Sequence, residues 1–276
     1  FSKFWQSLNL IWLSIIPFFA STEKEFGAIK ELAEGNGFVQ PQKSGVVLNK
    51  KEASRSAYIK KVMGTDPQSS HTGEKLTDLY LDAVFDYDLG THKTHQCADA
   101  AIYLNAMHKY EQGMAGQIKY HFTNRNVTKY QDWLNGINYK LDENRSWILH
   151  KEWTSPRVDN LETFKEWIKI VWKWAGTKSL PFDTISVNMK DIMPGDVFNN
   201  NGHAVSVVDV IVNNNTGHKK YILAQSWMRD RNTGEEHHIL INQNSNDVWY
   251  DLNTNETIVT PQWRFEPNHL IRFNIN

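Results

Sequence analysis

The sequence has little cysteine and almost no net charge, and each shortage excludes a class of protein. Its 276 residues include one cysteine, Cys97, so no disulfide can form within the chain. The 30 lysine and arginine residues nearly balance the 31 aspartate and glutamate residues, which gives a net charge of -1. A chain without a strong positive field does not attract nucleic acid, and we expect no nucleic-acid partner.

Several familiar nucleotide and hydrolase motifs are also missing. The sequence contains no phosphate-binding loop, no glycine fingerprint of a dinucleotide-binding fold and no Gly-x-Ser-x-Gly turn. We therefore expect no cofactor. The composition is that of a globular protein, with 40% hydrophobic and 12% aromatic residues, which is enough to bury a sizeable core.

The N-terminal segment resembles an export leader. An uncharged apolar run extends from Leu8 to Ala20 and is followed by strongly polar residues. The run is too short for a transmembrane helix, which needs roughly 20 residues, but it suits a leader. Residues 1–22 are therefore expected to be a signal peptide or N-terminal anchor, with a buried amphipathic helix as the alternative. We therefore expect an exported protein that is periplasmic or associated with the cell envelope. We expect no integral membrane span in its mature chain.

The rest of the chain divides into an irregular or helical segment, residues 23–75, and a main domain, residues 76–276. Residues 76–84 have helical spacing, although residues 80–87 also fit a strand. Clear helical patterns cover residues 97–110 and 161–175. Short runs rich in β-branched and aromatic residues come later and predict strands at 196–198, 203–212, 221–228, 237–241, 248–252 and 270–273. Helices first and strands later predict an α+β fold with a mostly antiparallel sheet.

A β-hairpin between about Pro194 and Met228 is the clearest local prediction. Its first strand opens with Gly202-His203-Ala204-Val205, and its return strand is Tyr221–Trp227. Strict alternation would give Val205, Val207, Asp209 and Ile211 the same face as His203. A polar histidine at the mouth of a buried strand is costly unless it is hydrogen-bonded, so His203 is either satisfied structurally or used.

Seven short motifs follow one another between residues 96 and 263. They are, in order, Gln96-Cys97-Ala98-Asp99-Ala100, Gly176-Thr177-Lys178-Ser179-Leu180, Gly195-Asp196-Val197-Phe198, Gly202-His203-Ala204-Val205, Leu223-Ala224-Gln225-Ser226, Trp249-Tyr250 and Thr260-Pro261-Gln262-Trp263. In this order they resemble a bacterial family that is known as domain of unknown function 4846. The resemblance covers about Leu76 to Phe273 and brings no established activity, although members often look exported or lipid-anchored. The chain departs from the family pattern at residues 199–201, at Trp227 and at residues 229–236.

A more distant similarity connects the chain with papain-like and cell-wall cysteine peptidases. In these enzymes a cysteine lies at a helix N-terminus, and a strand that begins with histidine follows later in the chain. The return strand then carries the third catalytic residue, which is polar. The similarity implies a papain-like core in which the helix that carries Cys97 packs on the sheet. It also implies a Cys97 nucleophile and a His203 base, with Gln225 holding the imidazole through its carbonyl oxygen. Asp209 is the alternative third residue if the strand bends.

The surroundings of Cys97 both favour and oppose this chemistry. A helix N-terminus lowers the pKa of a thiol, and an adjacent imidazole takes its proton. The negative charge of Asp99 near the helix start opposes a thiolate, unless that carboxylate caps the helix or binds a substrate ammonium. Gln96 is adjacent to the nucleophile and cannot simply supply the oxyanion hole. Other supporting candidates are Ser226 and Trp227.

The leading hypothesis is therefore an exported cysteine hydrolase or acyl transferase that acts on an amide or ester bond of a small peptide or cell-envelope substrate. The first alternative is a non-catalytic envelope-binding or structural protein that keeps the hairpin for stability. The second is a metal-binding protein, because His92, His95 and Cys97 lie close together and carry suitable zinc ligands.

Overall fold

A computed structural model describes residues 38–39, 81–84, 96–142, 145–213, 215–230, 234–240 and 249–274. The expected leader, residues 1–22, lies outside the described residues, as does almost all of the segment 23–75. The helices are α4 (Cys97–Glu111), α5 (Tyr130–Leu134), α6 (Leu161–Trp174) and α7 (Leu180–Asp183). The strands are β1 (Phe38–Val39), β2 (Leu81–Val84), β3 (Lys119–His121), β4 (Val127–Lys129), β5 (Ile137–Asp142), β6 (Arg145–Trp153), β7 (Thr184–Ser186), β8 (Asp196–Asn199), β9 (Ala204–Asn213), β10 (Lys219–Asp230), β11 (Gly234–Leu240), β12 (Trp249–Asp251), β13 (Ile258–Val259), β14 (Arg264–Phe265) and β15 (Leu270–Phe273).

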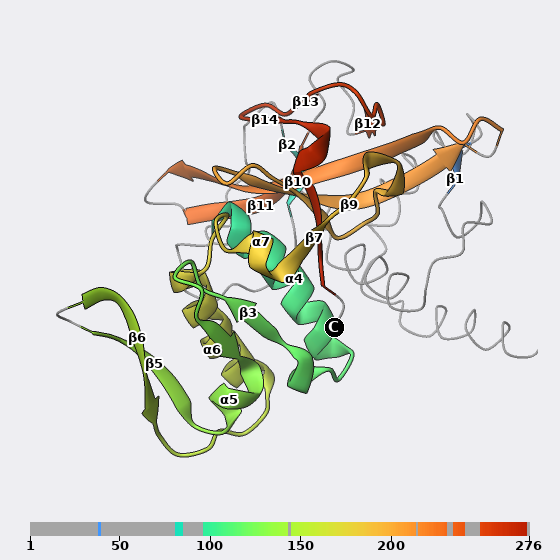
Figure 1. Cartoon of the computed structure of the whole chain (residues 1–276). Helices are drawn as coiled ribbons and strands as arrows, with labels where there is room; N and C mark the ends of the chain where they lie inside the picture. The colour runs from blue at the N-terminus through green and yellow to red at the C-terminus, as the bar shows by residue number, and fades with distance from the viewer. Residues whose placement is uncertain are drawn as a thin grey trace, which may run out of the picture.

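A central sheet with the strand order β2-β11-β10-β9-β8-β15-β7 organises the chain, and β1 and β12 pair with β9 and β10. Every strand pair in it is antiparallel. Figure 1 shows this sheet above the helices, with the β5–β6 hairpin projecting away from it. The α+β class and the antiparallel sheet are therefore confirmed. Of the two alternatives for the segment around residue 80, the strand is confirmed for residues 81–84, which pair with β11 as strand β2. Residues 76–80 lie outside the described residues.

The predicted hairpin is present as the β9–β10 pair, but its alternation is interrupted. Ile222 lies opposite Asp209, whereas the next residue of β10, Leu223, lies opposite Val207, so Val208 is an extra residue in β9. Such a bulge shifts the facing of every later side chain by one position. The prediction that Ile211 shares the face of Val207 is therefore wrong, because Ile211 packs with Val208 on the opposite face.

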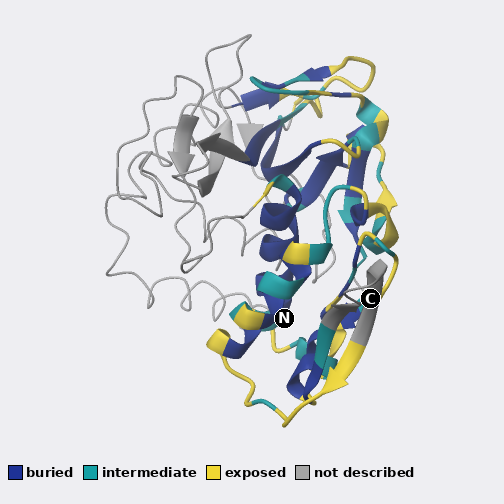
Figure 2. Cartoon of the chain, turned by 90° about the vertical axis from the view of Figure 1, so that its left-hand side faces the viewer, coloured by how far each residue is buried: buried dark blue, intermediate teal, exposed yellow. Residues whose placement is uncertain are grey.

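Helix α4 packs against one face of the β9–β10 pair and is buried on nearly all sides. Residues 98–109 are all buried, including Asp99, Asn105, His108 and Lys109. Figure 2 shows this burial along most of the helix beside the buried strands. Helix α6 adds the expected inner face of Phe164, Trp167, Ile168 and Val171 to the same hydrophobic cluster. Both predicted helices are therefore confirmed within a residue or so of their predicted ends.

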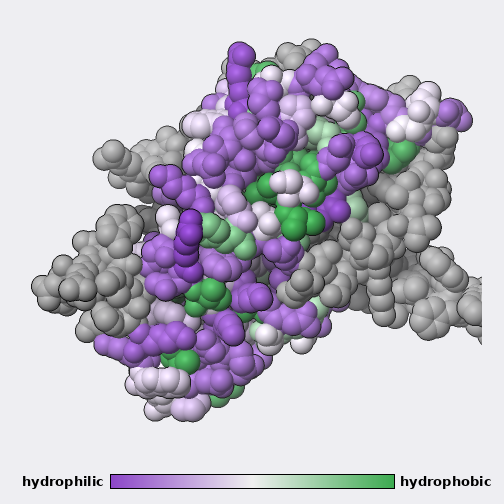
Figure 3. Space-filling model, viewed as in Figure 1, coloured by the Kyte–Doolittle hydropathy of each residue, from purple (hydrophilic) through white to green (hydrophobic). Residues whose placement is uncertain are grey.

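A second hydrophobic cluster fills the opposite face of the sheet. It includes Val205, Val207, Tyr221, Leu223 and Phe265, and strands β13 and β14 contribute to it. Alternating side chains of β9 and β10 therefore divide between two cores. Hydrophilic residues cover most of the face in Figure 3, with apolar residues in smaller areas. Among the described helices, none has the length and apolar character needed to cross a membrane.

Candidate functional site

Three consecutive asparagines form the turn that delivers His203 to the start of β9. The side-chain oxygen of Asn200 accepts hydrogen bonds from the backbone N–H groups of Gly202 and His203, each at 3.1 Å. Asn201 adopts a φ of 66°, a left-handed conformation that asparagine tolerates better than most residues. A Cβ atom at Gly202 would lie 2.9 Å from the Trp263 ring, so glycine allows this ring to approach the turn.

The His203 side chain is almost fully buried and has a defined partner. It is 3% exposed, and its Nε2 atom lies 2.7 Å from Oε1 of Gln225. Its ring lies 5.4 Å from that of Trp263 and 6.2 Å from that of Phe265, measured between centroids. Because a carbonyl oxygen only accepts, His203 carries its hydrogen on Nε2 and leaves the lone pair on Nδ1 when neutral.

Gln225 is fixed in turn by Gln262. The Gln225 side chain is 1% exposed, and its Nε2 atom donates to Oε1 of Gln262 at 2.6 Å. The turn that carries Gln262 is closed because the hydroxyl of Thr260 accepts a hydrogen bond from the N–H of Trp263. Gln262 belongs to one of the seven family motifs, but no role was predicted for it. The sequence offered one signal for such a role, because Gln262 lies between Pro261, which restricts the backbone, and Trp263.

Burial sets the protonation of His203. Loss of solvation lowers the pKa of this imidazole below its usual value, and the hydrogen bond to Gln225 opposes part of that shift. The imidazole is therefore neutral near pH 7. A neutral, hydrogen-bonded imidazole with a defined tautomer is a suitable proton acceptor.

Cys97 is the first residue of α4 and is partly exposed. The carboxylate of Asp99 accepts a hydrogen bond from the backbone N–H of Gln96 at 2.8 Å, so Asp99 caps the helix start. Because Asp99 is buried, this capping role fits it better than contact with a substrate ammonium. Gln96 itself is exposed at the N-cap position.

The structure brings His203 and Gln225 together, and it packs Cys97 against a hydrophobic cluster. Cys97 lies against the cluster that contains Ala204 and Ala224, the neighbours of those two polar residues. Successive side chains of a strand point to opposite faces, so His203 and Gln225 face away from α4 toward β13 and β14. A direct pair between Cys97 and His203 therefore has to form around the end of the sheet.

The remaining predicted residues are dispersed. Asp209 lies six positions after His203 in the continuous strand β9, and its carboxylate accepts from the N–H of Val210 at 2.8 Å. Ser226 is buried on β10, next to Gln225 in the chain but on the other face. Trp227 lies opposite Glu236 in the β10–β11 pair, and its side chain is outside the described residues.

The proposed zinc ligands cannot be assembled from what is described. His92 and His95 lie outside the described residues. Within the described part of the chain, no group of three histidine, cysteine, aspartate or glutamate residues could hold a metal ion. The metal-binding alternative therefore stays a prediction.

Comparisons with known proteins agree with the first of the two resemblances. Neither a curated protein nor a solved structure matches the chain. The likeness to cysteine peptidases consequently stays a prediction. Residues 49–272 match the model of the family described as domain of unknown function 4846. Because this match covers well over half of the sequence and includes all the candidate site residues in α4, β9 and β10, the chain belongs to that family.

Proposed function

We propose that the chain is a cysteine hydrolase or acyl transferase that cleaves an amide or ester bond. The observation that carries this proposal is the 2.7 Å contact between His203 Nε2 and Gln225 Oε1. It joins two residues that the peptidase resemblance had already paired, and it gives His203 the tautomer that a base requires. Gln262 extends the arrangement by holding the Gln225 amide in the matching orientation.

The reaction divides into two transfers of the acyl group. Cys97 Sγ loses its proton to Nδ1 of His203 and attacks the substrate carbonyl carbon, which forms a thioester. The bond to the leaving amine or alcohol breaks, and this group takes the proton from the imidazolium. Water or a second amine then attacks the thioester and gives a proton to His203; the C–S bond breaks, and the departing Cys97 thiolate takes this proton from the imidazolium. Gln225 keeps the ring oriented throughout.

The first turn of α4 favours the thiolate that this reaction needs. The unpaired N–H groups of a helix start stabilise a negative charge, and the Asp99 carboxylate is already engaged by the Gln96 N–H. His203 lies immediately before β9, so its ring is near the end of the sheet rather than in its middle. The proposal requires Cys97 to reach the ring around this end.

Small peptides, including those of a cell envelope, are the proposed substrate class. This part of the proposal rests on the leader-like sequence of residues 1–22 and on the peptidase resemblance. The same sequence supports an exported, envelope-associated location.

Alkylation of Cys97 with iodoacetamide across a range of pH tests the proposal directly. Because Cys97 is the only thiol, the rate of labelling reports this residue alone. We expect the wild-type thiol to titrate well below the free value of about 8.5, and we expect His203→Gln to return it toward that value. His218→Gln, which replaces an exposed histidine on the β9–β10 turn, is the matched control and should leave labelling unchanged. Equal titration in all three proteins would contradict the proposed pair.

A non-catalytic binding protein is the second candidate, and one observation favours it. Cys97 packs against the hydrophobic cluster that contains Ala204, whereas the His203 ring lies against Trp263 and Phe265 and is almost fully buried. In that case the hydrogen bonds that connect His203, Gln225 and Gln262 satisfy buried polar groups and stabilise the hairpin. This candidate predicts a thiol with the ordinary pKa and a normally folded Cys97→Ser protein that retains every binding property.

A further inference from the structure

The loop between α6 and α7, residues 175–179, carries most of a family motif that the proposed reaction does not use. Its own hydrogen bonds make it rigid. The backbone N–H of Gly176 donates to the Ser179 hydroxyl at 3.0 Å, and this hydroxyl donates to the Gly176 carbonyl oxygen at 2.9 Å. Ser179 is 1% exposed. Because the loop is fixed at both of these residues, a side chain between them can hold a neighbouring segment in place.

The same loop is attached to the hydrophobic cluster on which Cys97 packs. Leu180, which directly follows the loop, is buried and belongs to the cluster that contains Ala204 and Ala224. Ala175, the first residue of the loop, packs against that cluster, as Cys97 does. The packing of one cluster therefore fixes the loop relative to the start of α4.

Three hydrogen bonds join this loop to the asparagine turn, residues 199–201, and they form a closed cycle. The side-chain nitrogen of Asn199 donates to the Thr177 carbonyl oxygen at 3.0 Å, and the side-chain oxygen of Asn199 accepts from the Asn201 N–H at 3.2 Å. The Thr177 hydroxyl closes the cycle by donating to the Asn201 carbonyl oxygen at 3.0 Å. Asn199 is buried, so its two bonds are shielded from water. The cycle therefore holds Asn201 by both its backbone N–H and its backbone carbonyl group.

Asn201 lies two residues before His203, and its conformation sets the direction in which the chain enters β9. Its φ of 66° is left-handed, a conformation that residues other than glycine keep when surrounding contacts hold them in it. The Asn200 oxygen, in turn, accepts from the N–H groups of Gly202 and His203. A turn that is fixed in this way places the His203 ring where its Nε2 atom reaches Gln225. Loss of one bond from the cycle should therefore loosen that contact.

We propose that Thr177 is a positioning residue that holds His203 against Gln225 through the asparagine turn. The loop is fixed to the cluster on which Cys97 packs, and the turn carries His203, so the cycle connects the proposed nucleophile and base around the end of the sheet. The benefit for catalysis rests on the proposed function, whereas the hold on His203 does not.

Thr177→Val tests the proposal, because valine has nearly the same shape but cannot donate a hydrogen bond. This bond lies at an exposed edge, so the variant should fold normally. The readout is the exchange of the His203 Nε2 proton with solvent, followed by NMR on the full chain. We expect exchange to be about fivefold faster, as for the loss of one hydrogen bond of ordinary strength. Thr177→Ser keeps the hydroxyl and should restore the wild-type rate within about twofold.

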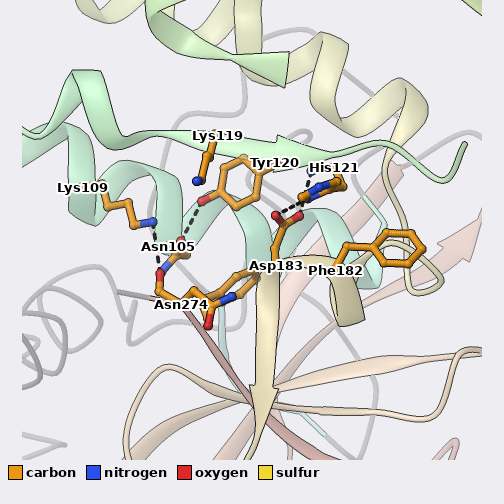
Figure 4. Close-up of a pocket in the computed structure, with 9 residues that line it drawn as sticks. Asn105, Lys109, Lys119, Tyr120, His121, Phe182, Asp183 and Asn274 are labelled. Carbon is orange, nitrogen blue, oxygen red and sulfur yellow. Dashed lines mark hydrogen bonds and ion pairs between the residues drawn. The ribbon is translucent and has the colours of Figure 1, made fainter. Parts of the chain in front are cut away.

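Thr184→Val is the matched control. The Thr184 hydroxyl also donates to a backbone oxygen, that of Leu180, at 2.8 Å. Thr184 follows Asp183, which Figure 4 shows paired with His121 at a cavity of about 120 Å³ between α4, β3, α7 and the end of β15. None of the residues that line this cavity belongs to the asparagine turn. We therefore expect the His203 proton to exchange in Thr184→Val at the wild-type rate.

Three outcomes of the exchange measurement would overturn the proposal. The first is an unchanged rate in Thr177→Val. The second is equal acceleration in Thr177→Val and Thr184→Val, which would assign the effect to overall stability. The third is equal acceleration in Thr177→Val and Thr177→Ser, which would assign it to the packing of the side chain rather than to the hydroxyl.

Labelling of Cys97 across pH separates this inference from the proposed function. Faster exchange in Thr177→Val beside a wild-type thiol with the ordinary pKa would keep the positioning of His203 and refute the proposed reaction. A lowered thiol pKa beside an unchanged exchange rate would support the reaction and refute the role of Thr177.

Discussion

Two histidines with similar hydrogen bonds have contrasting surroundings. His203 is 3% exposed and contacts the neutral amide of Gln225 at 2.7 Å, beneath two aromatic rings. His121 is partly exposed and contacts the carboxylate of Asp183 at the same distance, at the edge of a cavity. An amide fixes the tautomer without adding charge, whereas a carboxylate adds a negative charge next to the ring. The buried histidine is therefore held neutral with its lone pair on Nδ1, and the partly exposed one connects β3 with α7 at a surface.

Removal of the amide partner should have the largest effect. Gln225→Leu fills a similar volume but leaves the His203 Nε2–H without an acceptor inside the protein. We expect the free energy of unfolding to fall by about 2–3 kcal/mol, as for a buried donor left unpaired. Urea unfolding measures this change. Gln131→Leu, at an exposed position of α5, is the control and should change stability by less than about 0.5 kcal/mol. Similar values for the two variants would show that the buried amide contributes nothing special.

The pH dependence of stability should show the next largest effect. Burial lowers the pKa of His203 in the folded protein, so below about 6.5 the unfolded chain binds a proton that the folded protein does not. Stability from this residue is complete above that pH and is lost as the pH falls toward the folded pKa. The slope approaches about 1.4 kcal/mol per pH unit for one proton. Urea unfolding between pH 7.5 and 5 should therefore show a steeper loss for the wild type than for His203→Gln.

The charged pair should matter less for stability than the buried amide. Asp183→Asn weakens the contact with His121, but these side chains are 10% and 27% exposed, so water replaces part of the loss. We expect a cost of about 1 kcal/mol in urea unfolding. Asp251→Asn is the matched control, because Asp251 contacts His218 at 2.8 Å with both side chains well exposed. It should cost less than about 0.5 kcal/mol. A larger cost for Asp251→Asn than for Asp183→Asn would reverse the proposed role of burial.

One of these histidines could be predicted from the sequence and the other could not, for a physical reason. His203 stands at the start of an apolar strand, where a polar side chain is conspicuous, and its partner lies on the next strand. His121 and Asp183 are 62 positions apart. Asp183 ends the short helix α7, which has too few residues for a periodic pattern. Their contact depends on how α7 packs beside β3, and this packing cannot be read from either segment.

The same distinction applies to the fold. The long helices α4 and α6 and the β9–β10 hairpin were predicted because each has a strong local pattern. The bulge at Val208 was not, because Val207, Val208 and Val210 are chemically alike and any of them could face either core. The β5–β6 hairpin was also missed. For the elements that have a strong local pattern, the sequence therefore predicted the element itself more accurately than the face of the sheet that each side chain occupies.

The smallest energetic effect is expected at Gln262, although it should change the chemistry of His203 most specifically. Gln262 is partly exposed, so replacement by lysine should cost less than about 1 kcal/mol. An ammonium only donates, so Gln262→Lys favours a rotated Gln225 amide that turns its oxygen toward position 262 and its nitrogen toward His203. The imidazole then accepts at Nε2 and carries its hydrogen on Nδ1. The ¹⁵N chemical shifts of the two ring nitrogens distinguish these tautomers.

Gln262→Glu provides the matched control for this change. A carboxylate only accepts, so it keeps the Gln225 amide in its present orientation and leaves the hydrogen of His203 on Nε2. If both variants show the wild-type tautomer, then Gln262 does not set the orientation of Gln225, and the partner of His203 is fixed by burial alone. If only Gln262→Lys changes the tautomer, a partly exposed glutamine controls which nitrogen of a buried histidine can accept a proton. Only the second result gives the His203–Gln225–Gln262 chain a role that the His121–Asp183 pair lacks.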